Sequence, residues 1–140
     1  MIQENFLYFL WKYQYFNTQD LRTVDGDSIS IESTGFRNDF AGPDFKEARI
    51  RIDGMQWVGS VEMHVKASDW FRHGHQTDEN YHNVVLHVVW EADRVVLQPD
   101  GKAIPTLALQ PLVKPEVLRR YTAMVDTTAK IPCHDSLLKV

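Results

Sequence analysis

Hydrophobic side chains recur at helical spacing near both ends of the chain. Near the N-terminus, apolar and aromatic residues fall three or four positions apart, at Ile2, Phe6, Phe9, Leu10, Tyr13 and Phe16. This stripe predicts an amphipathic helix that ends near Asn17 and packs on a sheet through its aromatic face. A second apolar row follows Pro115, which suits the first turn of a helix, and it predicts a helix from Glu116 to about Val125.

Between these helices the pattern changes to alternation, which is typical of strands. Residues 28–32 alternate after Asp25-Gly26, and residues 48–52 alternate before Asp53-Gly54. Each Asp-Gly pair predicts a hairpin turn. The second turn leads into a long predicted strand, Met55–Lys66.

A further strand and a polar segment complete the middle of the chain. Residues 84–90 are almost continuously apolar, as expected of a strand covered on both faces. Shorter strands are expected at 95–97 and 104–109. The polar segment 68–83 is expected to contain one short helix near its end, with Thr77 or Asp78 as its cap.

Helices at both ends of a β-rich middle predict an α+β fold. We expect the N-terminal helix to pack on a mixed, mostly antiparallel β-sheet with the Asp53-Gly54 hairpin near its centre. We assign residues 1–112 to this single domain. Residues 113–140 are expected to form a helical segment that begins a further region of a longer protein. A β-sandwich or a cupin-like barrel with helical ends is the alternative architecture.

Composition fits a globular domain and sets limits on its partners. The 140 residues are 44% hydrophobic and 11% aromatic. The net charge of -4 gives no global attraction to nucleic acid, so such a partner would need a local basic patch or a metal ion. No apolar run approaches ~20 residues, so we expect no membrane partner. The lone Cys133 excludes an internal disulfide and fits the cytoplasm. A protein partner and the oligomeric state stay open.

Glu62, His64 and Lys66 are the most informative polar residues of the long predicted strand. Strand residues two apart project on the same face, so a carboxylate, an imidazole and an ammonium form one row. Upstream, Gly42-Pro43-Asp44 adds a second carboxylate. Metal-dependent phosphodiester hydrolysis requires carboxylate ligands for Mg²⁺ or Mn²⁺ and a cation near the attacking water or the phosphate.

Pro43-Asp44, a hairpin and then Glu62-x-His64 resemble the motif of the restriction-endonuclease-like, or PD-(D/E)XK, nucleases. In that motif a lysine stands two residues after the Glu. Here the position holds His64, and Lys66 lies one step farther on the same face. The resemblance implies a restriction-endonuclease-like core as the favoured topology. It also implies a nuclease acting on nucleic acid, with Asp44 and Glu62 as metal ligands and with His64 or Lys66 as further catalytic groups.

The register of the second hairpin decides whether Asp44 joins this row. A two-residue turn, continued without interruption, pairs Asp44 with Met63, on the face opposite Glu62. A one-residue bulge between them would exchange the faces. Gly59 is a plausible place for such a bulge, and Pro43 is a plausible place for regular pairing to end.

A cross-strand charge ladder is the alternative interpretation of the row. Without a bulge, Arg49 and Arg51 share the face of Glu62 and can pair with it across the strands. The charged row would then be the contact surface of a non-catalytic binding or scaffold domain.

Histidines suggest a second kind of metal site. Five of the six lie between residues 64 and 87, namely His64, His73, His75, His82 and His87. His73 and His75, with Glu79 four positions on, have the spacing of a cupin's first metal motif, which suits Zn, Fe or Ni. Asp69 lies just before them, either as a loop cap or as part of this polar site. His87 is either a satisfied core residue or a partner that orients a ligand on the neighbouring strand.

Longer strings of the chain are specific enough to indicate a family. They are Ala41–Phe45, residues 57–75 with Trp57-x-Gly59 and Ser68-Asp69-Trp70, and residues 81–90 ending in His87-Val88-Val89-Trp90. These strings resemble a bacterial family known as domain of unknown function 2851. The resemblance covers nearly the whole chain and implies no assigned activity, substrate or cofactor, so the nuclease hypothesis depends on the residues themselves.

Overall fold

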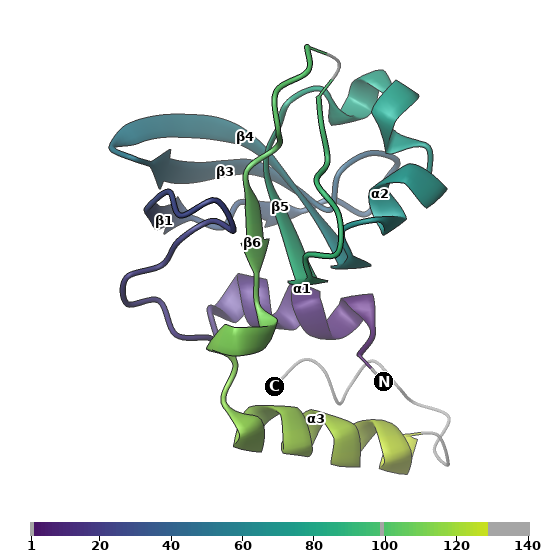
Figure 1. The fold of residues 1–140 in the computed structure, drawn as a ribbon. Helices are drawn as coiled ribbons and strands as arrows, with labels where there is room; N and C mark the ends of the chain where they lie inside the picture. Colours follow the sequence, from purple (N-terminus) through teal and green to yellow (C-terminus); the bar gives the residue numbers. More distant parts are fainter. Residues whose placement is uncertain (1, 99, 129–140) are drawn as a thin grey trace.

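The computed structural model describes residues 2–98 and 100–128, arranged as in Figure 1. Its elements are α1 (Glu4–Tyr13), β1 (Ile29–Ser33), β2 (Phe36–Arg37), β3 (Phe45–Ile52), β4 (Met55–Lys66), α2 (Asp69–Arg72), η1 (His75–Thr77), η2 (Glu79–Tyr81), β5 (Val84–Glu91), β6 (Thr106–Ala108), η3 (Gln110–Leu112) and α3 (Pro115–Thr128). Cys133 and the end of the expected helical segment lie outside the described residues.

The strands form one mixed sheet, and the expected α+β class is confirmed. The strand order is β1-β3-β4-β5-β6, with β2 also beside β3. β1, β2 and β4 run antiparallel to β3, whereas β4, β5 and β6 run parallel to one another. Figure 1 shows α1 across one side of this sheet, with α3 beyond it.

The N-terminal helix is shorter than the hydrophobic stripe predicted. It ends at Tyr13, where Gln14 adopts a left-handed conformation with φ 52°, rather than near Asn17. Its buried side chains are Phe6, Leu7, Leu10 and Trp11. The predicted stripe was therefore wrong in part. The helix packs through a face that includes Leu7 and Trp11, which the stripe did not contain, and Tyr13, which it did contain, is 47% exposed.

The strand predictions hold best where alternation is regular. β4 has the predicted bounds, and Asp53-Gly54 makes a two-residue turn that pairs Ile52 with Met55. The hairpin at Asp25-Gly26 is reduced to a single bridge between Arg22 and Ser28. The polar segment contains α2, η1 and η2 rather than one short helix.

A one-residue bulge in β3 changes the alternation of the central hairpin. Phe45 pairs with Val61, but Ala48 pairs with Gly59, so one extra residue of β3 is accommodated between these pairs. Glu47 lies in this interval with φ 57°, a conformation that most side chains avoid. Because the bulge reverses parity, Asp44 aligns with Glu62 and not with Met63.

The extra residue belongs to β3, so the expected bulge at Gly59 was wrong in its position. Gly35 faces the bulge, and a side chain there would collide with the Lys46 carbonyl and the Ala48 backbone. Gly59 has a different role. It lets the start of β5 approach β4, since a Cβ at Gly59 would lie 2.5 Å from the Asn83 carbonyl oxygen.

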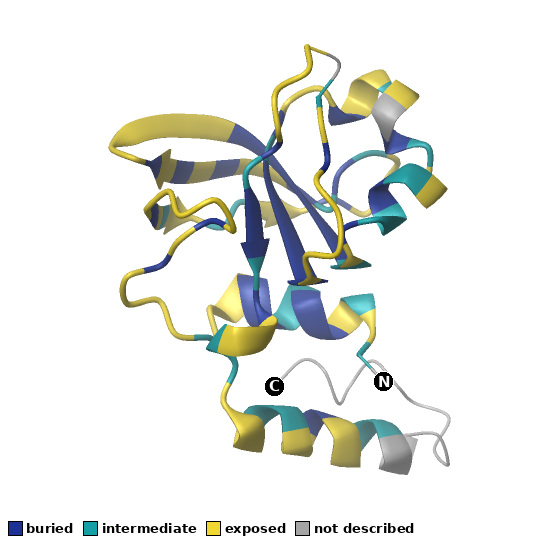
Figure 2. Ribbon diagram, viewed as in Figure 1, coloured by how far each residue is buried: buried dark blue, intermediate teal, exposed yellow. Residues whose placement is uncertain are grey.

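Apolar side chains cover both faces of the central strands. On the α1 side the core includes Val61, Met63 and Val88, whereas Val89 packs with Trp70 on the α2 side. Figure 2 shows this burial along β5 and the exposed outer end of the β3–β4 hairpin. Among the described residues, no helix combines the length and apolar character needed to cross a bilayer.

Replacing Gly59 with Ala should destabilise the fold. The new Cβ would approach the Asn83 carbonyl oxygen to 2.5 Å and the Val85 Cγ1 atom to 2.6 Å. We expect a loss of about 1–3 kcal/mol in unfolding free energy, measured by urea denaturation. Val58→Thr, at a neighbouring strand position that is 57% exposed, is the control and should change stability by less than about 0.5 kcal/mol. An equal effect of both substitutions would contradict the close packing at Gly59.

Candidate functional site

Two carboxyl groups meet where β3 begins beside β4. The backbone N–H of Asp44 donates to Glu62 Oε1 at 3.1 Å, and the backbone N–H of Met63 donates to Asp44 Oδ2 at 2.9 Å. Glu62 is only 3% exposed. The bulge thus joins the half-buried Asp44 and the buried Glu62 in one pair, with each carboxylate held by the backbone of the other strand.

Helix α1 and β2 add polar groups to this pair. The Tyr8 hydroxyl lies 3.1 Å from both Glu4 Oε1 and Asp44 Oδ1. A hydroxyl has one proton to donate, so it serves both oxygens fully only when one carboxyl group is protonated. Burial raises the pKa of Glu4, which makes Glu4 the better candidate for that proton. The Arg37 guanidinium lies 3.7 Å from Asp44 Oδ1 and 4.3 Å from the centre of the Tyr8 ring.

Three imidazoles lie on the other side of Glu62. His64 comes from β4, His73 follows α2, and His75 begins η1. His64 Nε2 is 3.3 Å from Glu62 Oε2 and 3.2 Å from His73 Nδ1. His75 Nε2 is 2.6 Å from the same Glu62 oxygen, but in an orientation that makes no hydrogen bond. One nitrogen from each imidazole lies within 4.8 Å of the other two.

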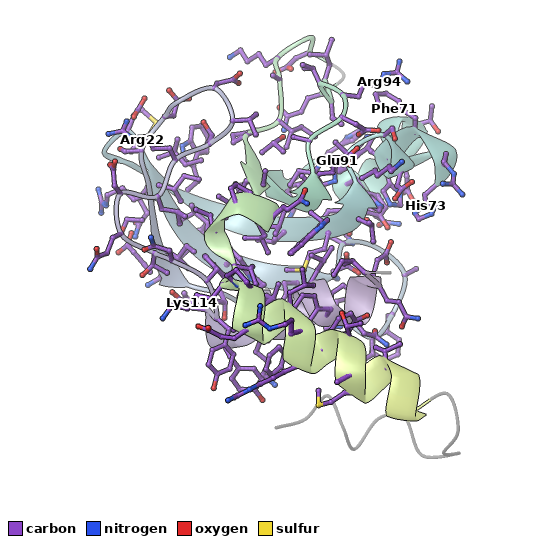
Figure 3. All side chains as sticks on the ribbon, turned by 60° about the horizontal axis from the view of Figure 1, so that its bottom comes forward. Arg22, Phe71, His73, Glu91, Arg94 and Lys114 are labelled. Carbon is purple, nitrogen blue, oxygen red and sulfur yellow. The ribbon has the colours of Figure 1, made fainter. Side chains whose placement is uncertain are left out.

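Aromatic and imidazole rings hold this cluster in place from behind. His87 Nε2 lies 2.8 Å from His64 Nδ1, and both side chains are almost completely buried. Tyr81 stacks on His75 at 3.7 Å between ring centres, and Trp70 meets His75 edge-on. His73 is the exposed member, and Figure 3 shows it at the outer side of the α2 segment.

Burial determines the protonation of the cluster. Desolvation, followed by the neighbouring Asp44 carboxyl group, raises the pKa of Glu62 well above its ordinary value. Desolvation lowers the pKa of His64 to about 2, that of His75 to about 4 and that of His87 to about 3. These imidazoles are therefore neutral near pH 7, which is the form that binds metal ions.

The donor atoms fit a nitrogen-preferring metal ion better than Mg²⁺. Zinc–nitrogen bonds of about 2.0–2.1 Å place tetrahedral ligand atoms roughly 3.3 Å apart. The His64–Glu62 and His64–His73 contacts, at 3.3 and 3.2 Å, match this spacing, whereas the His75–Glu62 contact, at 2.6 Å, is shorter. Three imidazoles and a carboxylate suit Zn, Fe or Mn, whereas Mg²⁺ prefers oxygen ligands alone. The group His64, His73 and His75 could hold a metal ion, with Glu62 as the adjacent carboxylate.

The structure brings five of the predicted site residues together and separates three others. Asp44, Glu62, His64, His73 and His75 form the cluster described above. Lys66, Asp69 and Glu79 lie outside the contacts described for it.

The three separated residues have other surroundings. Lys66 is exposed at the end of β4, and its backbone N–H donates to Asp69 Oδ2 at 3.2 Å. Asp69 Oδ1 accepts from Arg72 Nη1 at 3.0 Å, so this carboxylate serves the start of α2. Glu79 is exposed, and Glu62 occupies the place beside His75 that the cupin-like spacing gave to Glu79.

Sequence reasoning missed the contacts of Tyr8 and Arg37. Tyr8 lies in the N-terminal helix outside its predicted hydrophobic stripe, and Arg37 lies in a two-residue strand, so neither has a motif that marks it. The alternative offered for His87, a partner on the neighbouring strand, agrees with its contact to His64. The signal for that residue was a histidine within an otherwise apolar strand.

The metal-free protein should lose stability in mild acid. The pKa of His87 is about 3 in the folded state and near 6.5 when unfolded, so the unfolded chain takes up a proton that the folded chain excludes. This contribution is complete above about pH 6.5 and is lost as the pH falls toward the folded pKa. The raised pKa of Glu62 acts oppositely, since its contribution is complete below 4.5 and lost as the pH rises. As the pH falls from 6.5 to 5, the stability lost through His64, His75 and His87 together exceeds the stability gained through Glu62.

Urea unfolding from pH 7.5 to 5, with chelator present, measures this dependence. In His87→Leu the slope of unfolding free energy below about pH 6 should decrease by roughly 1.4 kcal/mol per pH unit, the value for one proton. His82→Leu, at an exposed position of the same region, is the control and should retain the wild-type slope. An unchanged slope in His87→Leu would contradict a neutral, buried His87.

Comparison with known proteins identifies the family. A family model described as "Protein of unknown function (DUF2851)" matches residues 4–140. No curated protein and no solved structure gives a significant match to the chain. The match confirms the family resemblance of the sequence strings and brings no activity with it. The chain therefore belongs to the DUF2851 family.

Proposed function

We propose that this protein is a divalent-metal-dependent phosphodiesterase that acts on nucleic acid. Glu62, His64, His73 and His75 are the ligands of the ion, and Asp44 is the carboxylate beside it. The observation that carries the proposal is the convergence of these side chains from β3, β4 and the α2–η1 segment. One buried ligand atom without a hydrogen bond supports it, since His75 Nε2 lies close to Glu62 Oε2 without a partner and would gain one by binding an ion.

The donor set favours Zn, Mn or Fe over Mg²⁺. When bound, such an ion polarises phosphate oxygens and makes water acidic enough to attack near neutral pH. Asp44 is placed to accept the proton of that water, because its carboxylate is fixed beside Glu62 by the Met63 N–H. His87 holds His64 through Nδ1 and so leaves Nε2 directed at the ligand cluster.

Arg37 supplies the positive charge that phosphodiester hydrolysis needs. Its guanidinium lies 3.7 Å from Asp44 Oδ1 and remains partly exposed to solvent. A guanidinium in this place can pair with a phosphate oxygen and stabilise the charge that develops in the transition state. The chain order, with Asp44 at the start of β3 and Glu62 on the next strand, is the order of the nuclease motif.

Metal-dependent cleavage tests the proposal directly. Purified untagged protein should contain Zn, Mn or Fe by elemental analysis and should nick supercoiled DNA or cleave RNA. Glu62→Gln and His75→Ala should lose the metal and lower cleavage at least about 100-fold, because each removes a ligand. His82→Ala, an exposed histidine outside the cluster, should retain both. Cleavage by Glu62→Gln at the wild-type rate, or none by any form across these metals, would overturn it.

A structural metal site within a non-catalytic binding or scaffold domain is the second candidate. The specific observation that favours it is the burial of Glu62, His64 and His75, because four protein ligands around an ion leave no position for water. In that case chelation would lower the melting temperature markedly, while the metal-loaded protein would cleave no phosphodiester. The same preparation therefore separates the two candidates.

Separate substitutions of Arg37 and Lys66 test which of the two side chains is the catalytic cation. We expect Arg37→Ala to lower the rate of cleavage roughly 10- to 100-fold, because Arg37 is the cation beside Asp44. Lys66→Ala should change the rate less than about threefold, since this exposed ammonium has no described contact with the cluster. Single-turnover rates with both variants fully metal-loaded provide the measurement. The opposite ranking would return the role to Lys66.

A further inference from the structure

A separate pocket opens beside the metal-binding cluster. It has a volume of about 470 Å³ and is bounded by the Ala41–Pro43 loop, the β3 bulge, the middle of β4 and residues 79–83. The same loop ends at Asp44, and η2 carries Tyr81, which stacks on His75. The pocket therefore shares two of its walls with the candidate site. A volume in this range suits a ligand of nucleotide size.

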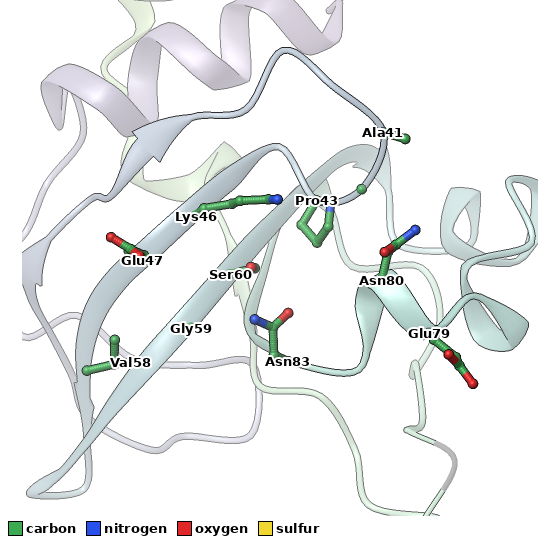
Figure 4. Close-up of a pocket in the computed structure, with 11 residues that line it drawn as sticks. Ala41, Pro43, Lys46, Glu47, Val58, Gly59, Ser60, Glu79, Asn80 and Asn83 are labelled. Atoms are coloured by element: carbon green, nitrogen blue, oxygen red, sulfur yellow. The ribbon is translucent and has the colours of Figure 1, made fainter.

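The lining is polar and carries an unpaired cation. Ser60 offers a hydroxyl, and Asn80 and Asn83 offer amide groups that both donate and accept hydrogen bonds. In Figure 4 the Lys46 side chain extends across the pocket toward Pro43. Among the described contacts of the chain, Lys46 takes part in no ion pair. Such groups can bind a phosphate and the edge of a base.

Positive charge continues from the pocket along the open face of the hairpin. Arg49 is the next outward-facing residue of β3 beyond the bulge, exposed and without an ion pair among the described residues. Arg51 follows, partly neutralised by Glu32 at 3.6 Å. Two carboxylates also border the pocket, but Figure 4 shows Glu47 and Glu79 directed away from Ser60.

An exposed aromatic side chain immediately precedes the loop that lines the pocket. Phe40 is 87% exposed and immediately precedes Ala41, the first lining residue of the pocket. It is the most exposed of the large hydrophobic side chains in the described part of the chain. A ring in water beside a polar, cationic pocket is the arrangement that proteins use to stack unpaired bases.

We infer that this pocket and its rim bind one unpaired strand of nucleic acid and lead it to the metal-binding cluster. Asn80, Asn83 and Ser60 contact the nucleotide in the pocket, Lys46 and Arg49 contact phosphates, and Phe40 stacks on a neighbouring base. The inference rests on the proposed phosphodiesterase function and names its substrate as a single strand.

The shape and charge of this region favour a single strand over a duplex. A pocket of about 470 Å³ accepts one flipped or unpaired nucleotide, whereas paired bases are stacked and out of reach. The exposed Phe40 ring needs the face of a base, which a duplex offers only at its ends. With a net charge of -4, the chain lacks the broad positive surface that duplex backbones attract, so binding depends on this local set.

Fluorescence anisotropy with short oligonucleotides in the presence of chelator tests binding without cleavage. The full chain should bind single strands of about 10 nucleotides, DNA or RNA, at least about tenfold more tightly than the matching duplex. Phe40→Ala should weaken single-strand binding about tenfold, as expected for one lost stacking contact. Lys46→Ala with Arg49→Ala should reduce the slope of log K against log salt by ~1.4, two contacts at ~0.7 each.

Arg119→Ala with Arg120→Ala is the matched charge control. Both arginines are exposed on α3, which lies beyond α1 on the opposite side of the sheet, so single-strand affinity should not change. Tighter binding of duplex, or unchanged affinity and salt slope in the pocket variants, would overturn the inference. Single-strand binding that depends on Phe40 and Lys46, without any cleavage, would support binding at the pocket and overturn the phosphodiesterase proposal. The two outcomes can be told apart because the metal-binding residues and the pocket residues are changed in separate variants.

Discussion

The candidate site depends on one extra residue in β3. If β3 and β4 paired without interruption, the Asp44 carboxylate would project toward the α1 side, among Val61, Met63 and the helix. Burying an unpaired carboxylate in that core would cost several kcal/mol. The bulge instead aligns Asp44 with Glu62, and its carboxylate accepts hydrogen bonds from the Met63 N–H and the Tyr8 hydroxyl of α1. Gly35 makes the bulge possible by leaving space beside Lys46 and Ala48.

The cluster built on this bulge is costly as a purely structural feature. His75 Nε2 and His87 Nδ1 are buried without hydrogen bonds, and the Glu62 carboxyl group is held in its neutral form. Buried polar groups that lack partners destabilise a fold, so hydrophobic side chains at these three positions would be the more stable choice. A metal ion would partner both His75 Nε2 and Glu62 Oε2. The proposed metal binding would therefore account for an arrangement that packing alone does not.

Much of the fold could be predicted because its helices and strands follow the local periodicity of hydrophobic residues. Alternation gave β4 its bounds and placed Glu62 and His64 on one face, and the apolar run gave β5 its burial on both faces. The position of the bulge could not be predicted in this way. It depends on a contact with Gly35, which is distant in sequence. The contacts of Tyr8 and Arg37 with Asp44 could not be predicted for the same reason, since only the folded chain brings these residues together.

Residue spacing also pointed to two site residues, Lys66 and Glu79, that lie outside the cluster, and the reason is physical. Lys66 has the parity of Glu62, but it lies at the end of β4, where the side chain reaches solvent. Glu79 has the cupin-like spacing from His75, yet η1 ends at Thr77 and Glu79 begins the separate turn η2, where its side chain is exposed. Spacing predicts a shared site only while a single regular element continues. Strand alternation correctly predicted which side chains share a face along β4 as far as His64. Residue spacing failed to predict a shared site across the turns that follow.

The unequal burial of the four proposed ligands decides what the ion can do. Glu62 and His64 come from one rigid strand, and His75 is clamped by Tyr81, so these three keep their places. His73 is exposed and belongs to a short segment after α2. Three fixed protein ligands and one replaceable ligand are the coordination of catalytic zinc, whereas four fixed ligands are that of structural zinc. Displacement of His73 by a phosphate oxygen or water would therefore open the site without disturbing its core. Because His73 faces solvent on the side of α2, the position that opens is also the one that substrate can reach.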